Sequence, residues 1–97
     1  MFRHVVMFRW SDDADPAAVA RAFEELDRLP GLVPSLSHLS VGADAHLAEG
    51  NFDAIIVADF DDSDDYLAYA DHPEHLRVVS DHLRPLIAER VAVQYTV

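Results

Sequence analysis

The segment DDSDDYLAYADHPEH, residues 61–75, decides the fold more than any other part of the chain. Its acidic run is typical of a helix N-terminus, where Asp62 or Ser63 can accept hydrogen bonds from free N–H groups. Pro73 favours a second helix start, because proline suits the first helical turn and forces His72 out of the helical region. The segment therefore predicts two successive helices with a sharp break between them.

Hydrophobic periodicity predicts the other elements. Strands are expected over residues 2–10, 36–42, 52–60 and 90–97, and helices over residues 16–29, 63–70 and 73–84. Asp15 and Pro16 mark the start of the first helix, and Pro85 predicts a kink at the end of the last. The resulting order, β-α-β-β-α-β, is that of a ferredoxin-like α+β fold.

The expected sheet is apolar on both faces, although the helices of such a fold can cover only one of them. In the strand over residues 52–60 both Ile55 and Ile56 are apolar, and in the first strand Met7 alternates with Phe8. An uncovered apolar face of this size is unfavourable in water. We therefore expect a homodimer that joins its sheet faces, which is the arrangement of a dimeric α/β barrel.

Composition narrows the functional classes. A chain of 97 residues, of which 51% are hydrophobic, fits one domain over residues 1–97. It contains no cysteine and no lysine, which excludes disulfides, thiol catalysis and Schiff-base chemistry. The net charge of −11 disfavours nucleic-acid and anionic membrane partners. Without a signal sequence or an apolar run of about 20 residues, a cytoplasmic protein is expected.

Three segments resemble a known protein family in sequence as well as in predicted secondary structure. They are the opening strand FRHVVMF at residues 2–8, the HPEH corner at residues 72–75 that follows Tyr69, and LRPL at residues 83–86. With them the chain resembles the stress-responsive A/B-barrel (Dabb) family over its whole length. Members of that family are dimeric α+β barrels, so the resemblance implies a single Dabb domain.

The resemblance also implies a site. The family includes the plant olivetolic acid cyclase, which closes a linear polyketide by aldol condensation. Its chemistry is assigned to a tyrosine and a histidine that match Tyr69 and His75, and a pocket histidine matches His4. A further pocket histidine of the cyclase is replaced by Ala54 in this chain, so the pocket differs.

The residues themselves support acid–base chemistry at His75. It lies in the first turn of the helix that Pro73 starts, where the positive end of the helix dipole disfavours imidazolium. A neutral imidazole can act as a general base, and the Tyr69 hydroxyl can donate a hydrogen bond to a developing enolate. The alternative interpretation is structural, with both side chains satisfying each other or the backbone at a helix corner.

The expected site is a small cleft between helices and sheet. Its ligand-facing residues are predicted to be His4, Phe23, Leu26, Ile56 and Val79, around the pair Tyr69 and His75. A small hydrophobic, carbonyl-bearing or phenolic ligand suits such a cleft. No redox cofactor is expected, and no metal site, because the histidine spacing lacks a third ligand.

Two alternatives to this function stay open. One is a non-catalytic, stress-responsive dimer in which the tyrosine and the histidines are structural. The other, a lesser one, is a haem-related monooxygenase-like barrel, in which His75 could serve as the axial ligand.

Overall fold

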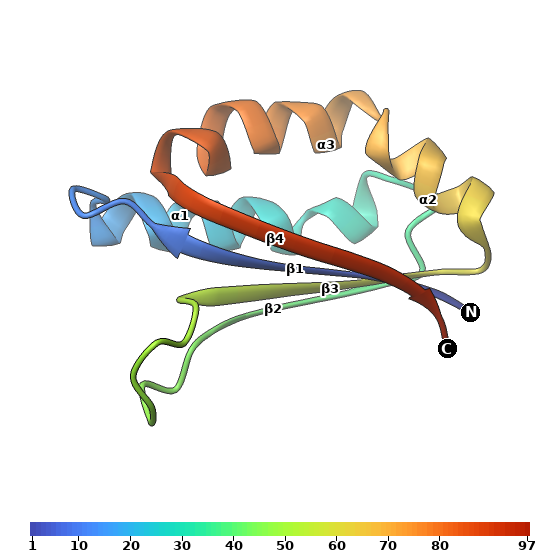
Figure 1. Ribbon diagram of the computed structural model, residues 1–97. Helices are drawn as coiled ribbons and strands as arrows, with labels where there is room; N and C mark the ends of the chain where they lie inside the picture. Colours follow the sequence, from blue (N-terminus) through green and yellow to red (C-terminus); the bar gives the residue numbers. More distant parts are fainter.

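The computed structural model describes all 97 residues and has the predicted ferredoxin-like α+β fold (Figure 1). Its strands and helices are β1 (Phe2–Trp10), α1 (Pro16–Asp27), β2 (His38–Ala43), β3 (Ala54–Phe60), α2 (Ser63–Ala70), α3 (Pro73–Val78) and β4 (Ile87–Thr96). None of the helices has the length and apolar character needed to cross a membrane.

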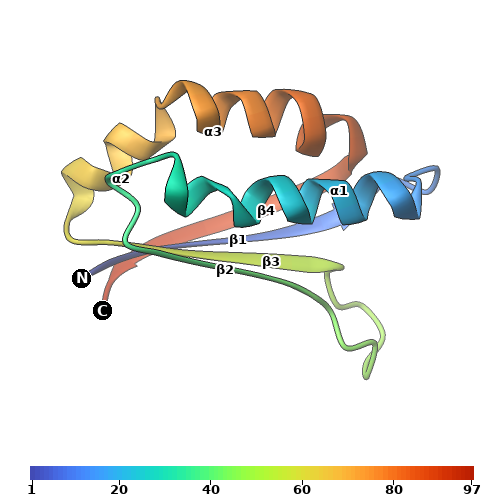
Figure 2. The ribbon, with the colours of Figure 1, turned by 180° about the vertical axis from the view of Figure 1, so that it is seen from behind.

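The four strands form one antiparallel sheet in the order β2-β3-β1-β4. β1 is central and pairs with both β3 and β4, so that His4 lies opposite Ala58 on one side and Gln94 on the other. All the helices lie on the same face of the sheet, as the two opposite views show (Figures 1 and 2). Side chains alternate between the faces of a strand, so His4 and Gln94 both point toward the helices.

The helix starts follow the predicted chemistry. The Asp15 carboxylate accepts a hydrogen bond of 3.1 Å from the backbone N–H of Ala17. The Asp62 carboxylate accepts one of 2.9 Å from the N–H of Asp65. His72 has extended backbone geometry before Pro73 and its ring Nδ1 accepts from the N–H of Glu74. His72 is therefore a helix cap rather than a candidate catalyst.

The last helical segment differs from the prediction of one helix over residues 73–84. α3 ends at Val78 and continues as a wider π turn over Val79–Leu83, followed by a 3₁₀ turn over Arg84–Leu86. Pro85 lacks an N–H and its ring conflicts with the carbonyl four residues earlier, so the regular α pattern cannot pass through it. The final strand also begins earlier than predicted, because Ile87 already pairs with Trp10.

The core fills the space between the helices and one sheet face. Its fully buried side chains include Phe60, Leu26, Leu29, Val33 and Val78. The opposite sheet face keeps large apolar side chains in contact with solvent: Met7, Ile55, Val91, Val93 and Tyr95 are 38% to 58% exposed. The two-faced apolar pattern predicted from the sequence is therefore present in the sheet.

Candidate functional site

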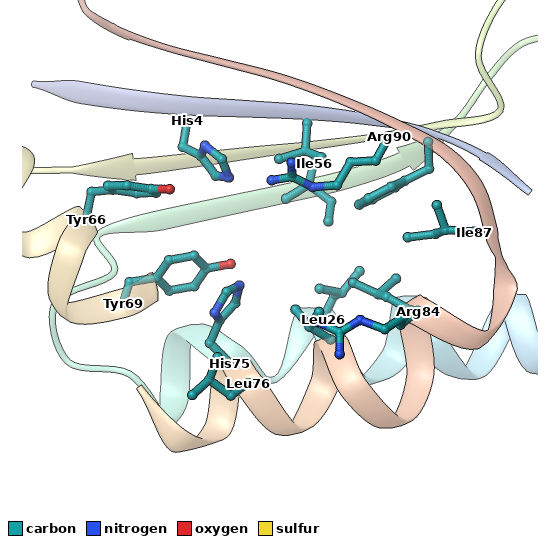
Figure 3. Close-up of a pocket in the computed structure, with 14 residues that line it drawn as sticks. His4, Leu26, Ile56, Tyr66, Tyr69, His75, Leu76, Arg84, Ile87 and Arg90 are labelled. Atoms are coloured by element: carbon teal, nitrogen blue, oxygen red, sulfur yellow. The ribbon is translucent and has the colours of Figure 1, made fainter. Parts of the chain in front are cut away.

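A cavity of about 410 Å³ lies between the helices and the covered face of the sheet (Figure 3). Ten of its fourteen lining residues are hydrophobic, and the other four are His4, His75, Arg84 and Arg90. No carboxylate lines it. This size is at the lower end of small-molecule sites, which are typically about 300–1,000 Å³ and mostly apolar with few polar groups.

His75 is held in the first turn of α3 by a backbone contact. Its Nδ1 lies 3.1 Å from the carbonyl oxygen of Ala70 and must donate to it, because a carbonyl can only accept. The neutral ring then has its free acceptor at Nε2. Burial lowers the pKa of His75, and the charge of Arg90 acts in the same direction, so the ring is neutral at pH 7. The sequence predicted this neutrality from the helix dipole, whereas burial is the main cause.

Tyr69 lies directly against His75. The two ring centroids are 4.2 Å apart, and the Tyr69 side chain is 3% exposed. Its hydroxyl points toward the cavity beside the His75 ring (Figure 3) and takes part in none of the side-chain hydrogen bonds within the protein. Burial raises the pKa of Tyr69 above its ordinary value, so the hydroxyl keeps its proton and serves as a donor.

His4 faces the same end of the cavity from β1. Its Nδ1 accepts a hydrogen bond of 2.8 Å from the Nε2 amide of Gln94, which leaves the ring proton on Nε2 as a donor. The same amide nitrogen lies 3.5 Å from the Tyr66 hydroxyl. Burial lowers the pKa of His4 to about 4, with smaller contributions from Arg90 and His75. His4 is therefore a neutral donor at pH 7.

The comparisons with known proteins fit this architecture. A family model described as the stress responsive A/B barrel domain, Dabb, matches residues 2–97. The chain belongs to the Dabb family. Among curated proteins, a stress-response A/B barrel domain-containing protein of Arabidopsis thaliana is 27% identical over 96 residues, which are 98% of this chain and 36% of that protein. The Dabb chain thus spans about a third of the length of this curated relative.

Solved structures give the same fold. A dimeric ferredoxin-like protein of unknown function from Thermobifida fusca is 41% identical, with a TM-score of 0.91 over 99% of this chain and 90% of that one. A hydroxynitrile lyase from Passiflora edulis has a TM-score of 0.87 over 99% of this chain and 92% of that one, but is 17% identical. At that identity the likeness of the lyase to the Dabb chain concerns the fold alone.

Most residues proposed from the sequence face the cavity of this Dabb domain. Those that line it are His4, Leu26, Ile56, Tyr69, His75 and Val79. Phe23 does not. It lies one turn before Leu26 on α1, and its ring packs edge-on to Trp10 at 6.2 Å, outside the cavity wall. Ala54, the first residue of β3, is also not among the residues that line the cavity, although it pairs with Phe8, which does line it.

The sequence reasoning missed four residues with polar groups at or beside the site, namely Tyr66, Arg84, Arg90 and Gln94. It also missed the apolar wall residues Val6, Phe8, Leu76, Leu83 and Ile87. Arg90 and Gln94 share a face of β4, and the apolar alternation of Val91 and Val93 drew attention to the other face. A register for β1 against β4 would have found them, because it places Gln94 opposite His4 and Arg90 opposite Phe8. Tyr66 could have been predicted at the site, because it lies one helical turn before Tyr69 and therefore on the same face of the helix.

Proposed function

We propose that this Dabb domain binds a small, largely apolar molecule with a carbonyl or phenolic group and acts on it by acid–base chemistry. His75 is the base, Tyr69 is the hydrogen-bond donor and His4 orients the ligand oxygen. The observation that carries the proposal is the pair of rings 4.2 Å apart at one end of an apolar cavity of about 410 Å³.

The proposed step is removal of a proton from the carbon next to a carbonyl group. The C–H proton passes to Nε2 of His75, the electron pair of that bond forms a C=C bond to the carbonyl carbon, and the π pair of the carbonyl moves onto its oxygen to give an enolate. The hydroxyl of Tyr69 and the Nε2–H of His4 donate hydrogen bonds to the enolate oxygen. A positioned base contributes about 10²–10⁴-fold to such a reaction, and one oxyanion donor about 10²–10³-fold.

The hydrogen bonding of the pair favours this proposal over a purely structural corner. A structural role requires that Tyr69 and His75 satisfy each other or the backbone. Nδ1 of His75 does bind the backbone at Ala70, but that contact leaves Nε2 available. The Tyr69 hydroxyl faces the cavity instead of a protein partner. Each ring therefore has one polar atom that a ligand can use.

The test is deuterium exchange at the methyl group of 2-acetylnaphthalene, an aryl methyl ketone, followed by ¹H NMR in D₂O. The protein should accelerate the exchange, and His75→Ala and Tyr69→Phe should each lower the acceleration by about 100-fold. His82→Ala is the matched control, since His82 lies 4.0 Å from Glu25 and does not line the cavity.

The stability of the same variants separates the two interpretations. The proposal requires that His75→Ala and Tyr69→Phe leave the free energy of unfolding within about 1 kcal/mol of the parent protein. If they melt the protein or break up its assembly while the parent neither binds nor exchanges the ketone, the non-catalytic dimer is the better account.

We also propose that the chain is a homodimer joined through the sheet face opposite the helices, here called the bare sheet face. On this face Val91 of β4 pairs with Met7 of β1 and Val93 pairs with Val5. Met7, Val91, Val93 and the nearby Tyr95 remain exposed in the single chain. Burial of apolar surface stabilises association by roughly 25 cal/mol per Å² before entropic costs. The Thermobifida fusca protein, which is 41% identical to this chain, is described as dimeric.

A further inference from the structure

The arginines of this chain are paired very unevenly. The sequence has 18 acidic residues and 7 arginines, so there are more than enough carboxylates to pair with every arginine. Arg3, Arg9, Arg28 and Arg77 each lie within 4 Å of a carboxylate oxygen. The remaining arginines, Arg21, Arg84 and Arg90, form no such ion pair, and two of these three line the cavity.

The cavity arginines are placed by the strand and turn that close the site. Arg90 projects from β4 on the face that carries Gln94, and its guanidinium reaches toward His4 (Figure 3). Arg84 lies at the 3₁₀ turn before β4. The other polar groups of the wall are neutral imidazoles and phenols, so nothing in the wall balances these two positive charges.

We infer that the cavity takes an anionic ligand, with an oxygen anion such as a carboxylate bound by Arg90 and a second contribution from Arg84. The inference rests on the proposed function only in placing the ligand in this cavity. A guanidinium binds a carboxylate through two parallel hydrogen bonds, which are stronger than neutral ones. The apolar part of the ligand then packs against the apolar wall. Its carbonyl group lies at the end of the cavity formed by Tyr69 and His75.

The overall negative charge does not oppose this local selectivity. Charges on the outer surface are screened over about 10 Å at 0.1 M salt, whereas the exposed guanidinium of Arg90 would act on a ligand in the cavity at contact distance. The net charge of the chain is −11, yet two of its arginines without an ion pair line this mostly apolar cavity. The unpaired positive charge therefore lies where an anion would bind.

The test compares two probes of nearly the same shape by isothermal titration calorimetry, namely 2-naphthoate and the neutral 2-acetylnaphthalene. The protein should bind the naphthoate more tightly. Arg90→Met should weaken naphthoate binding about tenfold or more and change acetylnaphthalene binding less than about twofold. Arg84→Met should have a smaller effect in the same direction. Arg21→Met is the matched control, an exposed arginine without an ion pair and away from the cavity.

The outcomes separate this inference from the proposed function. If acetylnaphthalene binds, Val79→Phe blocks it, and Arg90→Met leaves naphthoate binding unchanged, the anion inference is wrong and the cavity proposal stands. If neither probe binds, both are wrong. Should Arg90→Met fail to fold, the salt dependence of binding is the test. Raising NaCl from about 0.05 M to about 0.5 M must weaken the binding of naphthoate but not that of acetylnaphthalene. An equal response of both probes would overturn the inference.

Discussion

The side-chain amide of Gln94 donates a hydrogen bond of 2.8 Å to Nδ1 of His4, across a sequence separation of 90 residues. This contact fixes which nitrogen of the buried imidazole carries the proton. It makes His4 a donor toward the cavity, beside the acceptor at His75, so that two histidines at one end of the site have opposite roles. Gln94 is a positioning residue, since it acts through His4.

Replacing Gln94 by Glu should reverse the state of His4. A carboxylate beside Nδ1 favours imidazolium and should raise the pKa of His4 well above its value of about 4. The titration of the His4 ring protons by NMR measures this change. Gln94→Met, which is similar in length and uncharged, is the control and should leave His4 neutral at pH 7. An unchanged titration in Gln94→Glu would contradict the assigned contact.

Protein stability should fall as the pH drops below the ordinary histidine pKa. His4 and His75 both have pKa values lowered by burial, His4 from 6.5 to about 4. The unfolded chain therefore binds more protons than the folded chain between these values, and the stabilisation present above pH 6.5 is lost toward pH 4. For His4 the loss is on the order of 2 kcal/mol after allowance for solvent screening.

Urea denaturation at a series of pH values measures this effect. His4→Gln should flatten the dependence between pH 6.5 and pH 4, the range that the His4 shift defines. The contact with Arg3 lowers the pKa of Asp59 from its ordinary value of 3.8. The stability that Asp59 contributes is therefore lost only below about pH 3.8, outside the range of His4. If His4→Gln leaves the slope unaltered, other groups control the acid response.

A charge on the bare sheet face should separate the proposed dimer. Val93 is 58% exposed in the single chain, and Val93→Glu would bury an unpaired carboxylate at the joined faces. Analytical ultracentrifugation should then find a monomer where the parent protein is a dimer. Leu67→Glu is the control, because Leu67 on α2 is 56% exposed and lies away from that face. A dimeric Val93→Glu variant would rule out this interface.

The start of α2 should depend on one carboxylate of the acidic run. Asp62 accepts from the N–H of Asp65, so Asp62→Ala should lower the free energy of unfolding by about 1 kcal/mol. Asp64→Ala removes a neighbouring charge in the same turn without removing the cap, and should have a smaller effect. Chemical denaturation of the two variants measures the difference. Equal losses would show that charge rather than capping matters here.

Sequence reasoning predicted the local features of this fold well and the cross-strand features poorly. Alternation and cap chemistry located β1, α2 and the break at Pro73, because each depends on neighbouring residues. The π turn before Pro85 was not predicted, since proline indicates only that a regular helix stops, not how the chain adapts.

The sequence indicated the cavity-lining residues that lie close together in the chain, but not those that the sheet brings to the cavity from a distance. Tyr69 and His75 are close in sequence and close in space, so the HPEH corner pointed to both. Gln94 and Arg90 reach the cavity only through the register of β4 against β1, which a single sequence does not specify. Phe23 does not line the cavity, because helical spacing predicts the face of a helix but not the position along its axis at which a cavity ends.

The pairing of β1 with β4 makes the completion of this cavity depend on contacts between the two ends of the chain. Residues separated by most of the chain must meet, and such pairings form late because closing a long loop has an entropic cost. A chain in which β1, β3 and the helices had packed before β4 would hold Tyr69 beside His75 but lack Arg90 and Gln94 at the cavity. Capture of an anionic probe during refolding should therefore report the docking of the last strand rather than the collapse of the core.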